Sequence, residues 1–281
     1  MNDTVRTLFE SGRHLLRNAN VTDADFDAFS ICAGVTGIDR TEFLLNPERE
    51  VSENEKTRIE KMLNERASGR PLQYVLGEWT FFGRNFAVGE GVLIPRPETE
   101  QLVDLCIGEI KKNNFKTVFD LCAGTGCIGI TAACECPDTF VYLFELYDEA
   151  FSFLEKNVSL CPDGRVRAVR RDIFSGVPDG FPAADIIVSN PPYIPNEEMK
   201  SLQSEVRREP ATALCGGEDG LIFYRAVAEK WISALRVGGV LAVECGEHQS
   251  QKIAKMFEEY GVVETVTDFY GVDRFVVLHK K

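Results

Sequence analysis

Residues 117–129 read TVFDLCAGTGCIG, and this stretch decides how the rest of the chain folds. Its first five residues form a short apolar run of the kind found in a buried strand. The pattern Gly-x-Gly-x-x-Gly follows over Gly124–Gly129 and leads into an apolar helical run. Glycines between a strand and a helix permit a tight turn and let the backbone approach a ligand closely. The stretch therefore predicts a nucleotide-type α/β domain.

The next expected strand, residues 140–145, ends in a carboxylate. Glu145 lies about 20 residues after Gly126, where an acidic side chain that binds the ribose hydroxyls of a cofactor is expected. Strand, glycine loop, helix and acidic residue together predict a site for an adenosine-containing cofactor. They do not choose between NAD and S-adenosylmethionine.

Strand and helix patterns alternate through the rest of the chain. We expect further strands at 165–169, 184–189 and 240–244, helices at 148–158, 219–235 and 249–260, and an antiparallel pair at 263–269 and 274–278. The alternation predicts a parallel sheet with right-handed crossovers. An antiparallel pair at the end of such a sheet is typical of class I methyltransferases and less so of dehydrogenases.

The first part of the chain has a different pattern. Apolar residues recur at helical spacing up to about Gly69, and Ser52 with Glu55 forms a capping-box sequence. Strand patterns then flank a turn sequence at Gly83. We therefore expect three parts: a helical substrate-recognition domain at 1–74, a β-hairpin linker at 75–98 and a catalytic domain at 99–281.

Composition limits the classes of function. The net charge of −13 argues against a dedicated nucleic-acid binder, because phosphate contacts need a surplus of Lys and Arg. The nine cysteines are scattered without metal-ligand spacing, so we expect reduced thiols and no metal site. Residues 1–4 lack the start of a signal peptide and no apolar run could span a bilayer, so we expect a cytoplasmic protein.

A second motif, SNPPYI at residues 189–194, follows the expected strand 184–189. Its two prolines fix φ, remove two N–H donors and push the residues before them toward extended geometry. The result is a stiff segment rich in acceptors, beginning with the Asn190 amide oxygen, beside the ring of Tyr193. Such a site suits a planar N–H donor, either an amide or an exocyclic amine. A rigid proline turn capped by an aromatic ring would use the same residues, and they alone do not decide between these interpretations.

Together the motifs resemble an amino-methyltransferase that uses S-adenosylmethionine, and the wider pattern is similar to the release factor glutamine methyltransferase family (PrmC/HemK). The resemblance covers nearly the whole chain. Its most specific string is IPRPETE at residues 94–100, because the four-residue NPPY motif is shared with DNA adenine methyltransferases. The resemblance implies a Rossmann-like, seven-stranded α/β sheet with its last strand antiparallel, a small N-terminal helical bundle and a hairpin linker.

The resemblance also implies a substrate and a set of site residues. The substrate would be the glutamine of the Gly-Gly-Gln loop in class I peptide chain release factors, methylated on its side-chain nitrogen. The implied catalytic residues are Asn190, Pro191, Pro192 and Tyr193. The implied cofactor-binding residues are Glu98, Thr99, Cys122, Ala123, Gly124, Thr125, Gly126, Glu145, Asp172, Ile173 and Asn190. No membrane and no direct nucleic-acid partner are expected.

Three residues depart from the family pattern. Cys122 stands where the first loop glycine is usual, and Glu145 replaces the commoner aspartate. Ile173 stands where some members carry an aromatic residue near the adenine. We expect cofactor binding to tolerate these departures.

Other functions would use part of the same pattern. A glutamine methyltransferase of a ribosomal protein shares nearly all the motifs. An N6-adenine methyltransferase of DNA or RNA predicts a target-recognition domain and a basic face, and the sequence shows neither. An NAD-dependent dehydrogenase would leave residues 190–193 unexplained. A non-catalytic cofactor-binding scaffold stays open, because only a turnover assay excludes it.

Overall fold

The computed structural model describes residues 3–281. Residues 1 and 2, on which part of the signal-peptide expectation rests, lie outside the described residues. The chain divides into two compact units. The first is Met1–Glu78 with Ser204–Arg208, and the second is Trp79–Gln203 with Glu209–Lys281. The expected hairpin linker therefore falls almost wholly in the second unit.

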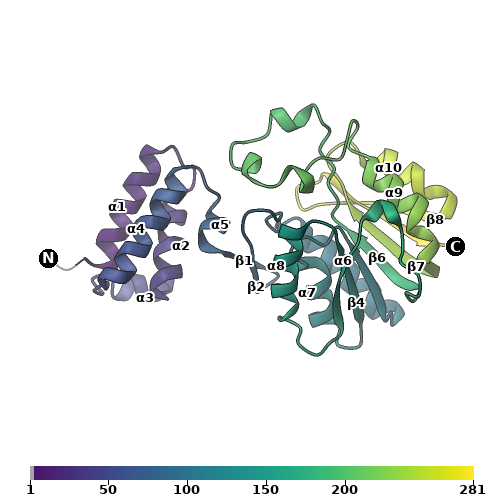
Figure 1. The fold of residues 1–281 in the computed structure, drawn as a ribbon, viewed down its shortest axis with the longest axis horizontal. Helices are drawn as coiled ribbons and strands as arrows, with labels where there is room; N and C mark the ends of the chain where they lie inside the picture. The colour runs from purple at the N-terminus through teal and green to yellow at the C-terminus, as the bar shows by residue number, and fades with distance from the viewer. Residues whose placement is uncertain (1–2) are drawn as a thin grey trace. The chain divides into compact units, whose positions relative to one another are not determined.

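The first unit is helical (Figure 1). Its helices are α1 (Val5–Asn18), α2 (Ala24–Thr36), α3 (Arg40–Leu45), α4 (Glu53–Ala67) and α5 (Leu72–Leu76). Helices α1, α2 and α4 pack against one another. The capping box expected before α4 is present, because the Ser52 hydroxyl accepts from Glu55 N and the Glu55 carboxylate accepts from Ser52 N.

A buried arginine holds the first unit together. Arg66 Nε lies 2.6 Å from Asp27 Oδ2, and Arg66 Nη2 lies 2.6 Å from Glu205 Oε1. Glu205 belongs to the short segment Ser204–Arg208, which comes from far along the chain. Two carboxylates around one buried guanidinium avoid the cost of an unpaired charge, and they explain why this segment belongs with the helices.

The second unit contains a seven-stranded sheet. Its strands are β3 (Thr117–Leu121), β4 (Phe140–Glu145), β5 (Val166–Arg170), β6 (Ala184–Ser189), β7 (Leu235–Glu244), β8 (Gly261–Thr267) and β9 (Asp273–Lys280). Their order is β5-β4-β3-β6-β7-β9-β8, and only β9 runs antiparallel to its neighbours. The expected sheet with its last strand antiparallel is confirmed. The order reverses beside β3, which is where open α/β sheets bind ligands.

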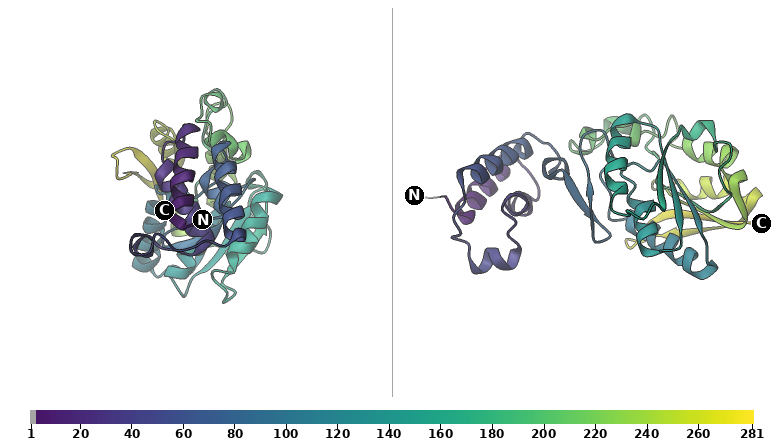
Figure 2. Two further views of the ribbon diagram at one scale, coloured as in Figure 1. Left: turned by 90° about the vertical axis from the view of Figure 1, so that its left-hand side faces the viewer. Right: turned by 60° about the horizontal axis from the view of Figure 1, so that its bottom comes forward.

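Helices cover both faces of this sheet (Figure 2). One face packs on α6 (Thr99–Asn113), α7 (Cys127–Glu135) and α8 (Asp148–Val158), and the other on α9 (Ile222–Lys230) and α10 (Ser250–Phe257). Side chains alternate between the two faces, as the strand geometry requires. Val118 and Ile186 enter the first core, whereas Phe119 and Ile187 enter the second.

A two-stranded hairpin, β1 (Glu78–Phe81) and β2 (Arg84–Ala87), precedes the sheet. Its two turn residues, Phe82 and Gly83, have φ of 50° and 71°. Positive φ at both positions matches the right-handed twist of the strands. Short 3₁₀ helices lie in the connections: η1 (Ile173–Ser175), η2 (Glu198–Lys200), η3 (Val206–Arg208), η4 (Ala211–Ala213), η5 (Ile232–Ala234) and η6 (Glu258–Tyr260).

The expected helix 219–235 is wrong at both ends. Helix α9 begins only at Ile222, and Leu235 already belongs to β7. Leu235 pairs with Ala184 across the sheet, and Arg236 Nε lies 2.7 Å from Asp185 Oδ1. These partners are distant in sequence, so the local apolar pattern gave no sign of them.

The structure of residues 3–281 bears on the expectations about membrane spans, metal sites and cysteines. No helix there is both long and apolar enough to cross a membrane. No group of three or more His, Cys, Asp or Glu side chains in this range is placed to hold a metal ion. The nine cysteines are free thiols.

Candidate active site

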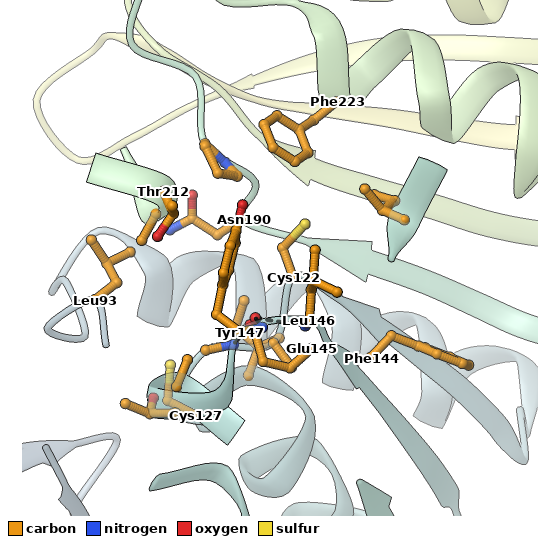
Figure 3. Close-up of a pocket in the computed structure, with 18 of the residues that line it drawn as sticks. Leu93, Cys122, Cys127, Phe144, Glu145, Leu146, Tyr147, Asn190, Thr212 and Phe223 are labelled. Carbon is orange, nitrogen blue, oxygen red and sulfur yellow. Dashed lines mark hydrogen bonds between the residues drawn. The ribbon is translucent and has the colours of Figure 1, made fainter. Parts of the chain in front are cut away.

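A pocket lies at the carboxyl ends of β3, β4 and β6 (Figure 3). Leu121, the last residue of β3, pairs with Phe144 of β4 and with Ser189 of β6. The residues that follow these three line the pocket: Cys122, Glu145 and Asn190. Strand register therefore brings together side chains from three separate parts of the sequence.

Most of the cofactor residues implied by the sequence line this pocket. They are Thr99, Cys122, Ala123, Gly124, Thr125, Glu145, Asp172, Ile173 and Asn190. Gly126 and Glu98 are not among the lining residues. Of the four implied catalytic residues, Asn190 and Pro192 line the pocket, whereas Pro191 and Tyr193 do not.

The glycines of the loop after β3 have different tasks. A Cβ on Gly124 would meet only Val92 Cγ2, at 3.8 Å, so this position leaves space beside the pocket. A Cβ on Gly126 would lie 2.6 Å from Leu154 Cδ1, and one on Gly129 would lie 2.4 Å from Leu143 Cδ2. Gly126 and Gly129 therefore allow α7 to pack closely on its neighbours, and Gly124 leaves room for a ligand.

The backbone conformation at Cys122 is one that favours glycine. Its φ is 57°, in the left-handed region that a side chain with a Cβ rarely adopts. The conformation costs a non-glycine residue roughly 1–2 kcal/mol. Burial raises the pKa of its thiol well above the usual value, so the side chain is a neutral part of the pocket wall.

Glu145 holds the shape of the cofactor side of the pocket. Its Oε2 accepts a hydrogen bond from Gly124 N at 2.9 Å, and its Oε1 accepts from Leu146 N and Tyr147 N at 2.7 and 3.0 Å. A carboxylate has about four acceptor positions. Three backbone donors therefore leave acceptor capacity for one ligand hydroxyl.

Asp120 is a buried carboxylate next to the glycine loop that the sequence analysis did not single out. It is fully buried in β3, and its Oδ2 accepts from Gly129 N in the first turn of α7 at 2.9 Å. Its Oδ1 has no hydrogen-bond partner among residues 3–281, and burial raises the pKa of the carboxyl to about 7. The sequence signal was a carboxylate inside an otherwise apolar strand, a placement that is costly unless the group is hydrogen-bonded or neutral.

Apolar side chains line one part of the pocket. Ile173, Phe174 and Phe223 line it, and the Phe174 and Phe223 ring centroids lie 5.3 Å apart. Asp172 lies beside them, and its Oδ1 accepts from Phe174 N at 2.9 Å. The sequence analysis noted an aliphatic residue at position 173 but missed Phe223, which α9 brings from a distant part of the chain (Figure 3).

Asn190 has one engaged end and one free end. Its Nδ2 donates to Thr99 Oγ1 at 3.1 Å, and the Thr99 hydroxyl donates to Glu244 Oε2 at 2.7 Å. Its Oδ1 accepts no hydrogen bond from residues 3–281. The amide therefore presents an acceptor at the pocket wall.

The backbone around Tyr193 is fixed from several sides. Gln249 Nε2 donates to Tyr193 O at 2.8 Å, and Gly246 N donates to Gln249 Oε1 at 3.0 Å. A Cβ on Gly220 would lie 2.3 Å from Tyr193 O. The Tyr193 ring packs beside the core under α9 and α10, and burial raises its pKa to about 12. The ring thus anchors the loop.

The buried carboxylate of Glu209 joins two segments of the chain at the pocket wall. Glu209 accepts from Ile94 N at 3.0 Å and forms an ion pair with Arg96. Arg96 lines the pocket, as do Thr212 and Ala213 a few residues after Glu209. The strings 94–100 and 209–213 therefore shape the same wall.

Comparisons with known proteins agree with this geometry. Residues 7–77 match the PrmC N-terminal domain, and residues 100–218 match the methyltransferase small domain. A release factor glutamine methyltransferase from Clostridium botulinum is 33% identical, over 98% of this chain and 99% of the relative. Relatives of the same name from Agrobacterium fabrum and Clostridium acetobutylicum are 33% and 36% identical, over 99% and 85% of this chain and 98% and 85% of the relatives.

Solved structures with low sequence identity share the fold. The hMettl16 catalytic domain has a TM-score of 0.57 at 14% identity, over 81% of this chain and 82% of that chain. A methyltransferase from Pyrococcus furiosus has a TM-score of 0.52 at 16% identity, over 82% of this chain and 99% of that chain. Both support the class I methyltransferase architecture seen in the sheet order.

Proposed function

Because the chain belongs to the release factor glutamine methyltransferase family, we propose that it methylates the side-chain nitrogen of a glutamine. The methyl donor is S-adenosylmethionine, and the acceptor is the glutamine of the Gly-Gly-Gln motif in a class I peptide chain release factor. The enzyme works in the cytoplasm, where release factors act. The family names of the relatives favour this acceptor over a ribosomal protein or an adenine base.

The residues of the pocket suit S-adenosylmethionine. The open space beside Gly124 admits a ligand close to the backbone, and Glu145 retains acceptor capacity for a ribose hydroxyl. Ile173, Phe174 and Phe223 supply an apolar wall for a flat adenine ring, and the Asp172 carboxylate also lines the pocket. Bound here, the cofactor supplies a methyl group on a positively charged sulfur.

The free Oδ1 of Asn190 is the observation that carries the proposal. A glutamine amide nitrogen is a poor nucleophile because its lone pair is delocalised into the carbonyl. Asn190 Oδ1 and the Pro191 carbonyl accept its two hydrogens and direct the nitrogen at the methyl group. Orientation of this kind contributes roughly 7–11 kcal/mol in favourable systems. The two acceptors also stabilise the positive charge that develops on the nitrogen. The nitrogen then loses one of its two protons to water, and S-adenosylhomocysteine is the second product.

Pro192 and Tyr193 serve this step by keeping the loop rigid. Pro192 fixes the backbone at the pocket wall, and Tyr193 holds it to the core. We assign Glu98 a supporting place at the start of α6, next to Thr99, because it does not line the pocket.

Methyl transfer from labelled S-adenosylmethionine tests the proposal. The acceptors are a purified class I release factor and the same factor with its Gly-Gly-Gln glutamine changed to alanine. We expect label on the first and none on the second. Label on both would place the methyl group elsewhere, and label on neither, with cofactor binding intact, would contradict the proposed acceptor.

A further inference from the structure

Glu244 and Thr99 form a hydrogen-bonded chain that ends at Asn190. Glu244 is the last residue of β7, and Thr99 is the first residue of α6; both side chains are 2% exposed. Ser189 pairs with Val243, so Asn190 and Glu244 follow neighbouring positions on β6 and β7. The chain runs from Asn190 Nδ2 to Thr99 Oγ1 at 3.1 Å and from the Thr99 hydroxyl to Glu244 Oε2 at 2.7 Å.

The donors and acceptors in this chain of hydrogen bonds are fixed by the chemistry of Glu244, Thr99 and Asn190. An ionised carboxylate can only accept, and a hydroxyl has only one proton to donate. The Thr99 proton therefore goes to Glu244, and only lone pairs of Thr99 face Asn190. An amide turned the other way would place Oδ1 against those lone pairs. The hydrogen-bond network thus decides which end of the amide faces the pocket.

We infer that Glu244 is a positioning residue for methyl transfer: through Thr99 it holds the Asn190 amide with Oδ1 toward the methyl acceptor. This role rests on the proposed function and deepens it. Glu244 does not line the pocket, so it acts without touching the substrate. Burying the Glu244 carboxylate with only a hydroxyl as its partner costs folding free energy. Its role in orienting the Asn190 amide explains why the group is there.

The same chain makes the site sensitive to pH. Burial raises the pKa of the Glu244 carboxyl to about 7. Thr99, Arg274 and Arg96 favour its charged form, whereas Glu98 opposes it. Other polar or titratable groups face it from the adjoining elements: Tyr193, Tyr224, whose hydroxyl donates to Glu244 O at 2.8 Å, and Cys245.

Protonation of Glu244 would reverse the direction of these hydrogen bonds. A protonated Glu244 can donate to Thr99 Oγ1, and the Thr99 proton is then free to turn toward Asn190. Asn190 can then rotate so that its NH₂ group faces the acceptor amide, donor against donor. Turnover is therefore full above the pKa of Glu244, where the carboxylate is ionised, and is lost as the pH falls through about 7.

Matched variants separate positioning from packing. Thr99→Val removes the hydroxyl at nearly constant volume, and Thr99→Ser keeps it. We expect Thr99→Val to lower kcat about tenfold and Thr99→Ser, the conservative variant that restores the hydroxyl, to recover most of that loss. The cofactor Kd, from calorimetry, should change less than about twofold in both. Equal kcat in the two variants, or a loss of cofactor affinity as large as the loss of kcat, would overturn the inference.

The side-chain NH₂ signal of Asn190 tests the chain without any activity. In the ¹⁵N-labelled full-length protein the signal is assigned by its loss in Asn190→Ala. We expect it to shift with a midpoint near pH 7, and to lose that shift in Glu244→Gln. A flat signal in the natural protein, or an unchanged titration in Glu244→Gln, would overturn the inference. Titration without transfer to a release factor would leave the inference standing and contradict the proposed function alone.

Discussion

The two halves of the pocket differ in how the protein satisfies their polar groups. On the cofactor side, Glu145 accepts three backbone N–H groups and so holds the loop in shape. On the methyl-acceptor side, Asn190 uses its donor on Thr99 and leaves Oδ1 free. The first half is a preformed cradle, whereas the second leaves the side-chain acceptor of Asn190 free. From this difference we expect cofactor affinity and turnover to depend on separate sets of residues.

On the cofactor side, Glu145→Ala is the strongest test of whether cofactor affinity and turnover depend on separate residues. The substitution removes the acceptor of three backbone donors as well as the proposed contact to the ribose. We expect the cofactor Kd to rise about 100-fold, since hydrogen bonds to a charged group contribute about 1.5–3 kcal/mol. Calorimetry measures the Kd, and kcat at saturating cofactor should stay within about threefold.

Glu145→Asp is the control, because it keeps a carboxylate on a shorter side chain. Its Kd should rise by about tenfold only. A fall in kcat larger than the rise in Kd would show that Glu145 acts on the chemical step and would undo the division.

Gly126 and Gly124 lie in one loop and allow a matched test, because Gly126 serves helix packing and Gly124 leaves space for a ligand. Gly126→Ala forces a Cβ against Leu154 and Ile130 at 2.6 and 2.7 Å, whereas Gly124→Ala meets only Val92 at 3.8 Å. Both positions have positive φ. We expect Gly126→Ala to lower the free energy of unfolding by about 3 kcal/mol and Gly124→Ala by about 1 kcal/mol.

Denaturant unfolding without cofactor measures both changes. The order should reverse for cofactor affinity among the folded proteins, with the larger loss in Gly124→Ala. Equal destabilisation by the two substitutions would contradict the separate tasks of these glycines.

On the methyl-acceptor side, Gln249→Ala tests the support of the loop. It leaves Tyr193 O without its side-chain donor and Gly246 N without its acceptor. Of these two lost hydrogen bonds, only the one to Tyr193 O holds the loop directly, and one hydrogen bond contributes about 1 kcal/mol. We therefore expect kcat to fall about fivefold to tenfold with the cofactor Kd unchanged. Gln251→Ala, at an exposed position of α10, is the control and should match the natural protein in steady-state kinetics.

The smallest effect concerns Cys122. Cys122→Gly and Cys122→Ala both remove the thiol, but only glycine relieves the left-handed backbone. The glycine variant should therefore be more stable than the alanine variant by about 1 kcal/mol, after the larger chain entropy of unfolded glycine is taken into account. Thermal unfolding of the pair checks this, and an alanine variant as stable as the glycine variant would contradict it.

The cofactor half was largely predictable from the sequence because its signals are local. The strand, the glycines and Glu145 follow one another at fixed spacing, and the structure places Glu145 beside Gly124. Asp172 and Ile173 also line the pocket as expected. Phe223 escaped prediction because α9 brings it from a distant stretch.

The acceptor half was predictable only in part. The rigid SNPPYI segment pointed to Asn190, but the chain through Thr99 to Glu244 joins three elements that only tertiary packing brings together. The expected helix 219–235 failed for the same reason, because the pairing of Leu235 with Ala184 is a contact across the sheet.

One measurement tests the central claim most directly: a single turnover by Asn190→Ala preloaded with labelled S-adenosylmethionine and mixed with the release factor. We expect the variant to hold as much label as the natural protein and to transfer it about 100-fold to 1,000-fold more slowly, as when one transition-state hydrogen-bond partner is removed. Transfer at the natural rate, or loss of the bound label before mixing, would contradict the account of Asn190 as the acceptor that directs the glutamine nitrogen.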